Sequence, residues 1–438
     1  MARSASAFGG LPQLIHLTPE PLGLYFRIGR NDHRELLQLF TSGESRFLGV
    51  VCDPTYSKFQ GELVDRALER RLDVILDPRT LASATVGGFT SSLGQLPWGR
   101  GRVHVEEDFQ AASGKRLIGS LARFAGERRY TQVLTPTHLL RTISDKWWDI
   151  DQALTSHLRF ELDRAGGADV SLLYSLAISY SMLRDRHERR ALISGLRSLP
   201  VEGLWLSVDG LGSASTPTAV RTYLEAIAEF HTLNIPVVAD HVGGLVGLAL
   251  AAFGGVGAIA HGVTNGERFD TAHWRKPRTD SSFGLSKRVY IPTLDLLLKS
   301  AEARSLFAFG RRATALFGCN DTRCCPRGVV DMLENPAQHF LRRRIDEILN
   351  LSAIPLSLRP ARFVDQRLRS TTDAVLAAAN LEWTDVALGK RMREQRKRLD
   401  RMRIALGDLA ASADKRSISI VPHRRIVRVV HERPPVSH

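Results

Sequence analysis

Short runs of apolar and β-branched residues alternate with longer segments of helical period through most of this chain. The runs lie at 47–52, 74–76, 132–134, 170–174, 204–208, 235–239, 256–260 and 288–291. Their apolar character is nearly continuous, which is typical of strands that helices cover on both faces of a parallel sheet. The pattern therefore predicts repeated β-strand–α-helix units.

About eight such units over about 250 residues are what a (β/α)8 barrel needs, so we expect an α/β fold with a TIM-like barrel. An open doubly wound sheet is the alternative, because periodicity does not reveal closure. We expect an N-terminal strand and helix extension at 1–45, the barrel at 46–300, a Cys/His segment at 301–350 and a basic helical and C-terminal extension at 351–438. The partner of the strand at 24–28 is left open.

Several predicted strands end in acidic residues or histidines. These residues are Asp77, Asp209, Asp240, His241 and His261. In a parallel barrel such positions fall on the C-terminal rim, where active sites are built, so we expect these residues to be catalytic. Two rim carboxylates could divide into an ionised nucleophile and a protonated acid. The alternative is that each acidic residue only caps a helix or closes a turn.

Glycines follow two of these strand ends. Gly243 and Gly244 follow one end, and Gly262 follows another. Because glycine lets a flat ring or a phosphate approach the main chain, we expect these three residues to bind substrate. His138, in a predicted loop, is a further candidate for substrate contact. Tight turns and a structural histidine are the alternatives.

The chain is basic, with 60 Lys and Arg against 46 Asp and Glu and a net charge of +14. This favours a polyanionic partner such as nucleic acid, although it is also compatible with a basic surface that only maintains solubility. Leu and Met recur at spacings of three and four over 388–409 if Gln395 fills one seam position, which predicts an amphipathic helix. Its polar face carries Arg393, Arg396, Lys397 and Arg401, which we expect to bind phosphates unless the helix is merely solvated.

Three of the four cysteines, Cys319, Cys324 and Cys325, lie close together and are followed by His339. Three thiolates and one imidazole suit a tetrahedral zinc ion, and four protein ligands are typical of a structural rather than a catalytic site. Buried structural cysteines beside a surface histidine are the alternative.

So few cysteines are typical of a reducing compartment, and the first residues carry no secretory signal, so we expect a cytoplasmic protein. The run at 242–260 has no charge, but six glycines divide it. We therefore expect a buried segment and no membrane contact. The oligomeric state is left open.

Two passages resemble the tRNA-guanine transglycosylase superfamily, including its DNA-modifying members. One is Val242-Gly-Gly244 followed by a helix and Gly255-Val256, and the other is Cys319 to Cys325 leading to His339. The resemblance covers about 235–345. It implies a TIM barrel, a structural zinc ion, and a nucleic-acid substrate, tRNA or DNA. It also implies exchange of a nucleobase for a small-molecule deazaguanine base through a covalent Asp–ribose intermediate.

The chain departs from this family at the nucleophile. The family's Phe-Asp should follow Gly-Val directly, but this sequence has Gly257-Ala-Ile-Ala-His261 there, and Phe269-Asp270 comes only later. Three hypotheses follow. The chain is a base-exchanging enzyme of nucleic acid, a metal-dependent hydrolase or lyase with a metal on His241, His261 and an Asp, or a catalytically inactive nucleic-acid-binding barrel.

Overall fold

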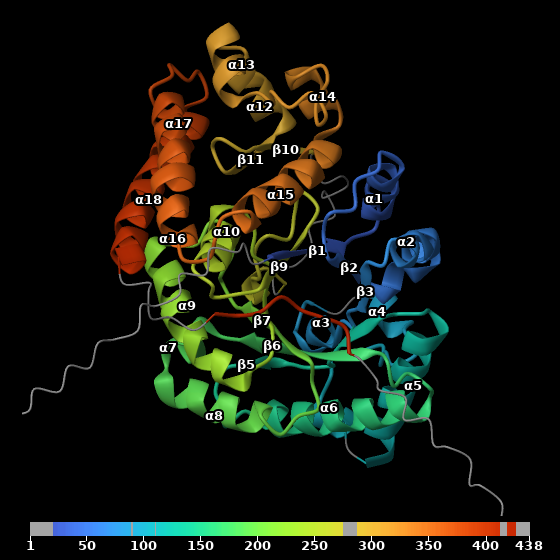
Figure 1. Cartoon of the computed structure of the whole chain (residues 1–438). Helices are drawn as coiled ribbons and strands as arrows, with labels where there is room; N and C mark the ends of the chain where they lie inside the picture. The colour runs from blue at the N-terminus through green and yellow to red at the C-terminus, as the bar shows by residue number, and fades with distance from the viewer. Residues whose placement is uncertain (1–20, 89–90, 110, 275–286, 412–417, 426–438) are drawn as a thin grey trace, which may run out of the picture.

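The computed structural model describes residues 21–88, 91–109, 111–274, 287–411 and 418–425, and its centre is a closed barrel of eight parallel strands (Figure 1). The strands are β1 (Gly23–Ile28), β2 (Gly49–Cys52), β3 (Asp73–Leu76), β4 (Gln132–Leu134), β6 (Ser171–Ile178), β7 (Gly203–Val208), β8 (Val237–Asp240) and β9 (Ala258–Gly262). Pairing of β4 with β6 and of β9 with β1 closes the ring, and the short β5 (Leu139–Leu140) pairs in parallel with the last residues of β6. The predicted TIM-like barrel is confirmed.

One barrel strand differs from the prediction. The run at 24–28 is β1, and Tyr25 is in register with Gly49 on one side and Ala260 on the other. The run at 288–291 is instead β10 (Arg288–Ile291), antiparallel to β11 (Leu296–Lys299) in a separate hairpin. Placing 24–28 in an extension and 288–291 in the barrel was wrong, because the two runs are equally apolar and only their pairing distinguishes them.

Helices surround the barrel and connect its strands. They are α1 (Asp32–Thr41), α2 (Ser57–Glu69), α3 (Thr80–Ala84), α4 (Ser91–Gly94), α5 (Ala111–Glu127), α6 (Lys146–Arg164), α7 (Tyr180–Arg184), α8 (Arg186–Leu196), α9 (Pro217–Phe230), α10 (Gly244–Ala252) and α11 (Thr271–Trp274), with 3-10 turns η1 (Pro54–Tyr56), η2 (Glu106–Phe109) and η3 (His231–Leu233). Local chemistry explains their starts. The Thr216 side chain accepts a hydrogen bond from the Ala219 N–H at the start of α9, where Pro217 takes the first helical position.

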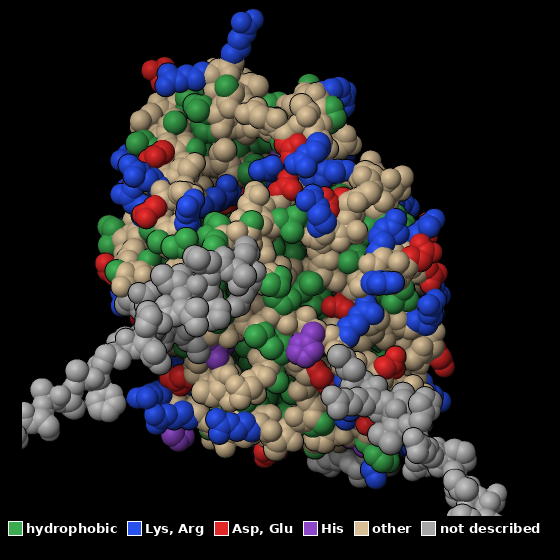
Figure 2. Space-filling model, in the orientation of Figure 1, with side chains coloured by type: hydrophobic (Ala, Val, Ile, Leu, Met, Phe, Trp, Pro, Cys, Tyr) green, Lys and Arg blue, Asp and Glu red, His purple; other side chains and the backbone are tan. Residues whose placement is uncertain are grey.

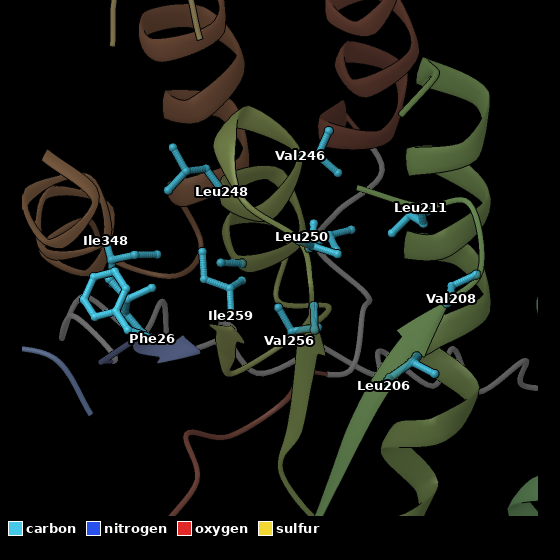
Figure 3. Close-up of a cluster of buried hydrophobic side chains, with 14 of the residues drawn as sticks. Phe26, Leu206, Val208, Leu211, Val246, Leu248, Leu250, Val256, Ile259 and Ile348 are labelled. Atoms are coloured by element: carbon cyan, nitrogen blue, oxygen red, sulfur yellow. The ribbon is translucent and has the colours of Figure 1, made fainter. Parts of the chain in front are cut away.

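Two apolar layers hold the barrel. Inside it lie Tyr25, Val51, Ile75, Leu134, Leu173, Trp205, Val238, Ala258 and Ala260. The alternate side chains point outward against the helices. Figure 3 shows part of this outer layer, where Phe26 and Ile259 of the wall meet Leu248 of α10 and Ile348. All of α10 is buried, as its apolar sequence predicts. In the described part of the chain no helix is long and apolar enough to cross a membrane.

The segment 418–425 closes the N-terminal end of the barrel. The Ser419 hydroxyl accepts a hydrogen bond from the Val237 N–H at 2.9 Å. The Arg424 Nε donates to Asp73 Oδ1 at 2.8 Å, and Asp73 also accepts from the Tyr25 hydroxyl inside the barrel. Because this end is filled, the open end is the one where the strands finish.

The remaining helices follow the hairpin. They are α12 (Ser300–Phe307), α13 (Arg311–Phe317), α14 (Val329–Glu334), α15 (Pro336–Ser352), α16 (Arg359–Arg362), the π-helix η4 (Phe363–Leu368), α17 (Arg369–Ala379) and α18 (Val386–Ala411). Helix α15 packs on β1, α1 and β10, and α18 packs on α17 and α9. Figure 1 shows α12, α13 and α14 stacked beyond α15, away from the barrel. The predicted amphipathic helix is confirmed, since its apolar seam is buried.

Candidate functional site

The residue that organises the open end of the barrel is Arg27 on β1. Its Nε and Nη2 donate to the two carboxylate oxygens of Asp240, both at 2.6 Å. Its Nη1 donates to Asp77 Oδ2, also at 2.6 Å. A charge inside a barrel is stable only when it is paired, and the ends of β3 and β8 supply the two partners.

Arg27 keeps both aspartates ionised. Burial alone would raise the pKa of Asp240, but the Arg27 guanidinium outweighs burial and lowers this pKa to about 2. Burial is likewise outweighed at Asp77 by Arg27 and Arg79, so the pKa of Asp77 is below its usual value. We expected one of the rim carboxylates to be a protonated acid. Asp240 is not that residue, because it is ionised.

The two carboxylates differ in accessibility. Each Asp240 oxygen accepts two hydrogen bonds, from Arg27 and either the His241 N–H or the Ser207 hydroxyl, and the side chain is 2% exposed. Asp77 is 18% exposed, and its Oδ1 accepts from the Arg79 N–H. Asp77 is therefore the carboxylate of this pair that a ligand can reach.

His241 lies beside this pair. Its backbone is left-handed, with φ of 57°, and its ring stacks on Phe269 with 5.7 Å between centroids. Nδ1 lies 3.3 Å from the Gly266 carbonyl oxygen, and Nε2 lies 3.7 Å from Asp240 Oδ2. Burial lowers the pKa of His241 in spite of Asp240, so the imidazole is neutral at pH 7. With the proton on Nδ1, Nε2 is free to accept one.

Asp77, His241 and Gly262 line one cavity of about 590 Å³, which we call the mouth cavity. Its other walls are the start of α1 and the junction of α14 and α15 at 334–337. Five basic residues line it, Arg27, Arg30, Arg79, Lys287 and Arg288, together with five acidic ones, Asp32, Glu35, Asp53, Asp77 and Glu334. The site thus offers an ionised carboxylate, a neutral imidazole and side chains of both charges to one ligand, in a volume ordinary for small-molecule sites.

Two other predicted acidic residues lie elsewhere. Asp209 is held by Thr271, whose N–H and hydroxyl each donate to it at 2.8 Å, and it lines a separate hollow of about 360 Å³. Asp270 pairs with Arg268 at 3.2 Å and is not among the residues lining the mouth cavity. Neither side chain is therefore gathered with Asp77 and His241.

His261 lies outside the barrel wall. Its ring contacts Phe26 and Phe340, with centroids 5.7 and 5.6 Å away, and it is fully buried. Ala260, its neighbour on β9, is the residue that faces the interior. His261 does lie near the end of β9, as predicted, but its side chain faces outward and does not reach the mouth cavity. The metal site that was the alternative hypothesis for His241 and His261 does not form, because the barrel wall separates them.

Of the residues predicted to bind substrate, Gly262 lines the mouth cavity, whereas Gly243, Gly244 and His138 do not. A Cβ on Gly243 would lie 2.2 Å from Glu267 Oε1, and one on Gly244, whose φ is +61°, would lie 2.7 Å from Asp295 Oδ1. These two glycines accommodate the chain's own carboxylates and do not reach the cavity. His138 is buried away from it, 3.7 Å from the Trp147 ring, with Nδ1 2.6 Å from Asp151 Oδ1.

The three cysteines and His339 meet as predicted. Their Sγ atoms and the His339 Nδ1 all lie within 4.8 Å of one another. The carbonyl of Asp321 accepts from the N–H groups of both Cys324 and Cys325, and this tight turn lets adjacent cysteines converge on one point. His339 Nε2 lies 3.0 Å from the Tyr290 carbonyl oxygen, which fixes Nδ1 as the free ligand atom. The donor set and its geometry fit a tetrahedral metal ion.

A buried chain of contacts links this Cys/His cluster to the mouth cavity. The Tyr290 hydroxyl donates to Glu347 at 2.8 Å, and Arg344 binds Glu347 at 2.9 Å and Glu267 at 2.6 Å. Glu267 adjoins Gly266, whose carbonyl contacts His241. The cluster therefore supports the loop on which His241 rests.

On α18 the predicted residues Arg393, Arg396, Lys397 and Arg401 are all exposed. Arg396 pairs with Asp400 at 3.6 Å, whereas Arg393, Lys397 and Arg401 have no ion pair with any described residue. The helix thus presents free positive charge.

Sequence reasoning missed Arg27 and Arg79 at the mouth cavity. Arg27 had a signal, because it is the one charged residue in the apolar run 24–28 and alternates with Tyr25, which faces the interior. No sequence pattern pointed to Arg79, whose backbone is left-handed with φ of 60°.

No family model and no curated protein sequence matches the chain. Solved structures similar to it are TIM-barrel enzymes. The type I 3-dehydroquinate dehydratase of Clostridium difficile matches at 10% identity and a TM-score of 0.37, over 59% of this chain and 90% of that one. A GH10 xylanase from Bispora sp. MEY-1 matches at 11% and 0.35, over 55% and 82%. A GH26 β-mannanase from Bacteroides ovatus matches at 11% and 0.36, over 60% and 85%.

Proposed function

We propose that this chain is a nucleobase-exchanging enzyme that acts on nucleic acid, with its active site in the mouth cavity. The observation that carries the proposal is that an ionised, accessible carboxylate and a neutral imidazole line the same cavity. Base exchange needs one group that traps the sugar cation and one that carries a proton, and these two residue types supply both.

In the proposed reaction, an Asp77 oxygen bonds to C1′ of the nucleotide as the C1′–N bond to the leaving base breaks. The leaving base takes up one proton, and the incoming base gives up one when its nitrogen displaces the carboxylate from C1′. The two steps balance without a redox partner. The leaving base takes its proton from solvent, because the neutral His241 carries none on Nε2. His241 Nε2 accepts the proton that the incoming base gives up and returns it to solvent, while Asp240 keeps Arg27 in place and Arg27 keeps Asp77 ionised.

The Cys/His cluster, Cys319, Cys324, Cys325 and His339, would hold a structural zinc ion. A zinc ion with four protein ligands supplies folding energy and no open position for chemistry. The assignment of zinc to this cluster is supported by the convergence of four suitable donor atoms. The α18 face with Arg393, Arg396, Lys397 and Arg401 would bind phosphates outside the cavity.

A binding protein without catalysis is the competing proposal, and one observation favours it. Strand β9 occupies the place where the resembled family has its Phe-Asp nucleophile, and its interior residues are Ala258 and Ala260. Asp77 would then have to replace that nucleophile.

The test is incorporation of labelled guanine into tRNA and into DNA by the purified protein. We expect Asp77→Asn to lower incorporation by roughly a thousandfold or more and to abolish a denaturation-resistant protein–nucleic acid adduct. Asp270→Asn is the matched control, because Asp270 pairs with Arg268 and is not among the residues lining the mouth cavity. Nucleic-acid binding by the wild type without incorporation or adduct would favour the binding protein instead.

A further inference from the structure

The mouth cavity continues into a groove along the Cys/His cluster. It shares Gln38 and Asn335 with a neighbouring hollow of about 400 Å³. That hollow shares Ser42, Cys324 and Arg342 with a third one of about 410 Å³. We call the second and third hollows the α1–α15 groove, because α1 and 42–46 form one wall while 321–327 and α15 form the other.

Arginines line this groove from end to end, and four acidic residues, Glu44, Asp321, Asp331 and Asp346, line it with them. Arg327, Arg342 and Arg323 line the hollow beside the mouth cavity, and Arg46 lines the far one. Arg323 and Arg46 are 76% and 54% exposed. Arg342 donates to the Ser42 hydroxyl and has no carboxylate within ion-pair distance in the described part of the chain. In Figure 2 this region shows Lys and Arg side chains gathered with acidic ones across α15.

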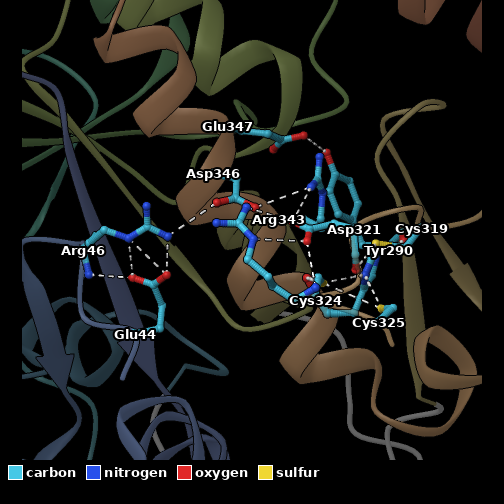
Figure 4. A network of polar contacts seen from close by, with 12 residues as sticks. Glu44, Arg46, Tyr290, Cys319, Asp321, Cys324, Cys325, Arg343, Asp346 and Glu347 are labelled. Carbon is cyan, nitrogen blue, oxygen red and sulfur yellow. Dashed lines mark hydrogen bonds and ion pairs between the residues drawn. The ribbon is translucent and has the colours of Figure 1, made fainter. Parts of the chain in front are cut away.

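Ion pairs fix both walls before any ligand binds. Asp346 of α15 accepts from Arg343 at 3.4 Å and lies 3.8 Å from Arg46 across the groove. Arg343 also lies 3.8 Å from Asp321 in the cysteine turn. Figure 4 shows this network running from Glu44 and Arg46 to the three cysteines. The acidic residues therefore hold guanidinium groups in position, and each guanidinium keeps donors free for another anion.

We propose that the α1–α15 groove binds the sugar–phosphate backbone of a polynucleotide strand whose reacting nucleotide occupies the mouth cavity. This inference rests on the proposed function and adds the path of the substrate. An enzyme that works on a base takes that nucleotide out of the stack, so the flanking phosphates must lie beside the cavity. The guanidinium group of arginine can donate two parallel hydrogen bonds to phosphate oxygens, and the arginines of this groove lie next to the mouth cavity.

The experiment measures binding of fluorescein-labelled single-stranded DNA and RNA oligonucleotides, and of GMP, at several KCl concentrations. The groove variant is Arg323→Gln with Arg342→Gln. Its matched control is Arg311→Gln with Arg312→Gln on α13, two exposed arginines outside the groove with the same change of charge. Metal content and far-UV circular dichroism verify that both variants are folded.

Loss of two phosphate contacts should weaken oligonucleotide binding roughly 25-fold at about 0.1 M salt and lower the salt slope by about 1.4. GMP binding should stay unchanged, because one nucleotide fits in the mouth cavity alone. Groove and control variants that bind oligonucleotides alike would overturn the groove while leaving the proposed function standing, provided that the wild type still binds and exchanges bases. Absence of oligonucleotide binding by the wild type would overturn both.

Discussion

Arg27 explains why two neighbouring aspartates have different roles. Its guanidinium must be paired because it lies within the barrel wall, and Asp240 takes the bidentate position while Asp77 takes the remaining nitrogen. Bidentate pairing saturates Asp240, whereas single pairing leaves Asp77 lone pairs that face the cavity. The charge of both aspartates thus depends on Arg27, which itself lines the mouth cavity.

The pairing of Asp240 with Arg27 predicts that the free energy of unfolding depends on pH. The folded pKa of Asp240, about 2, lies below the unfolded value of about 3.9, so its stabilisation is present above pH 4 and is lost as the pH falls from about 4 to about 2. Asp240→Asn should cost about 3–5 kcal/mol at pH 7, because Arg27 loses its bidentate partner. Urea unfolding at pH 7 and at acidic pH measures both effects.

The acid-side loss of stability should be shallower in Asp240→Asn than in the wild type. The control is Asp53→Asn, whose side-chain oxygen can still accept from the Thr55 N–H, so it should cost less than about 1 kcal/mol. Equal unfolding free energies for the wild type and Asp240→Asn at pH 7 would contradict the pairing.

At the scale of elements, periodicity predicted the fold class well and the face of single residues poorly. Strand character and helix seams depend on averaged apolar content, so the barrel and α18 were predictable from sequence. The side that a strand residue faces depends on register, and a shift of one residue reverses it. His261 was misplaced in this way, since Ala260 and not His261 faces inward. Contacts between distant segments, such as Arg27 with Asp77, leave no local pattern at all.

The α18 seam gives a prediction for this element. Leu399 is fully buried against neighbouring helices, so Leu399→Ala should destabilise the protein by about 2–5 kcal/mol through lost burial and a cavity. Ile404→Ala on the same helix is the control. That side chain is 67% exposed, so its loss should stay within about 0.5 kcal/mol. Thermal unfolding of both variants measures the difference, and equal Tm values would mean that α18 is not docked through this seam.

On the scale of the whole molecule, the barrel does not build its mouth cavity alone. The junction of α14 and α15 forms one wall, and α15 carries both His339 of the Cys/His cluster and Arg344 of the buried chain that reaches Glu267. A metal ion in the cluster would therefore stabilise more than the cysteine turn. It would fix α15 against β10 and, through Arg344, the loop that contacts His241.

Metal removal tests this dependence. The wild type should contain about one zinc ion per chain, and Cys324→Ser with Cys325→Ser should contain none, while Cys52→Ser, a buried cysteine outside the cluster, should retain it. Because the cluster supports the loop after β9, metal loss should increase amide hydrogen exchange at 287–291 and at 262–268, and leave β3 and β6 protected. Mass spectrometry of exchanged peptides measures this. Faster exchange limited to 319–325 would show that the cluster stabilises only its own turn, and the mouth cavity would then be independent of the metal.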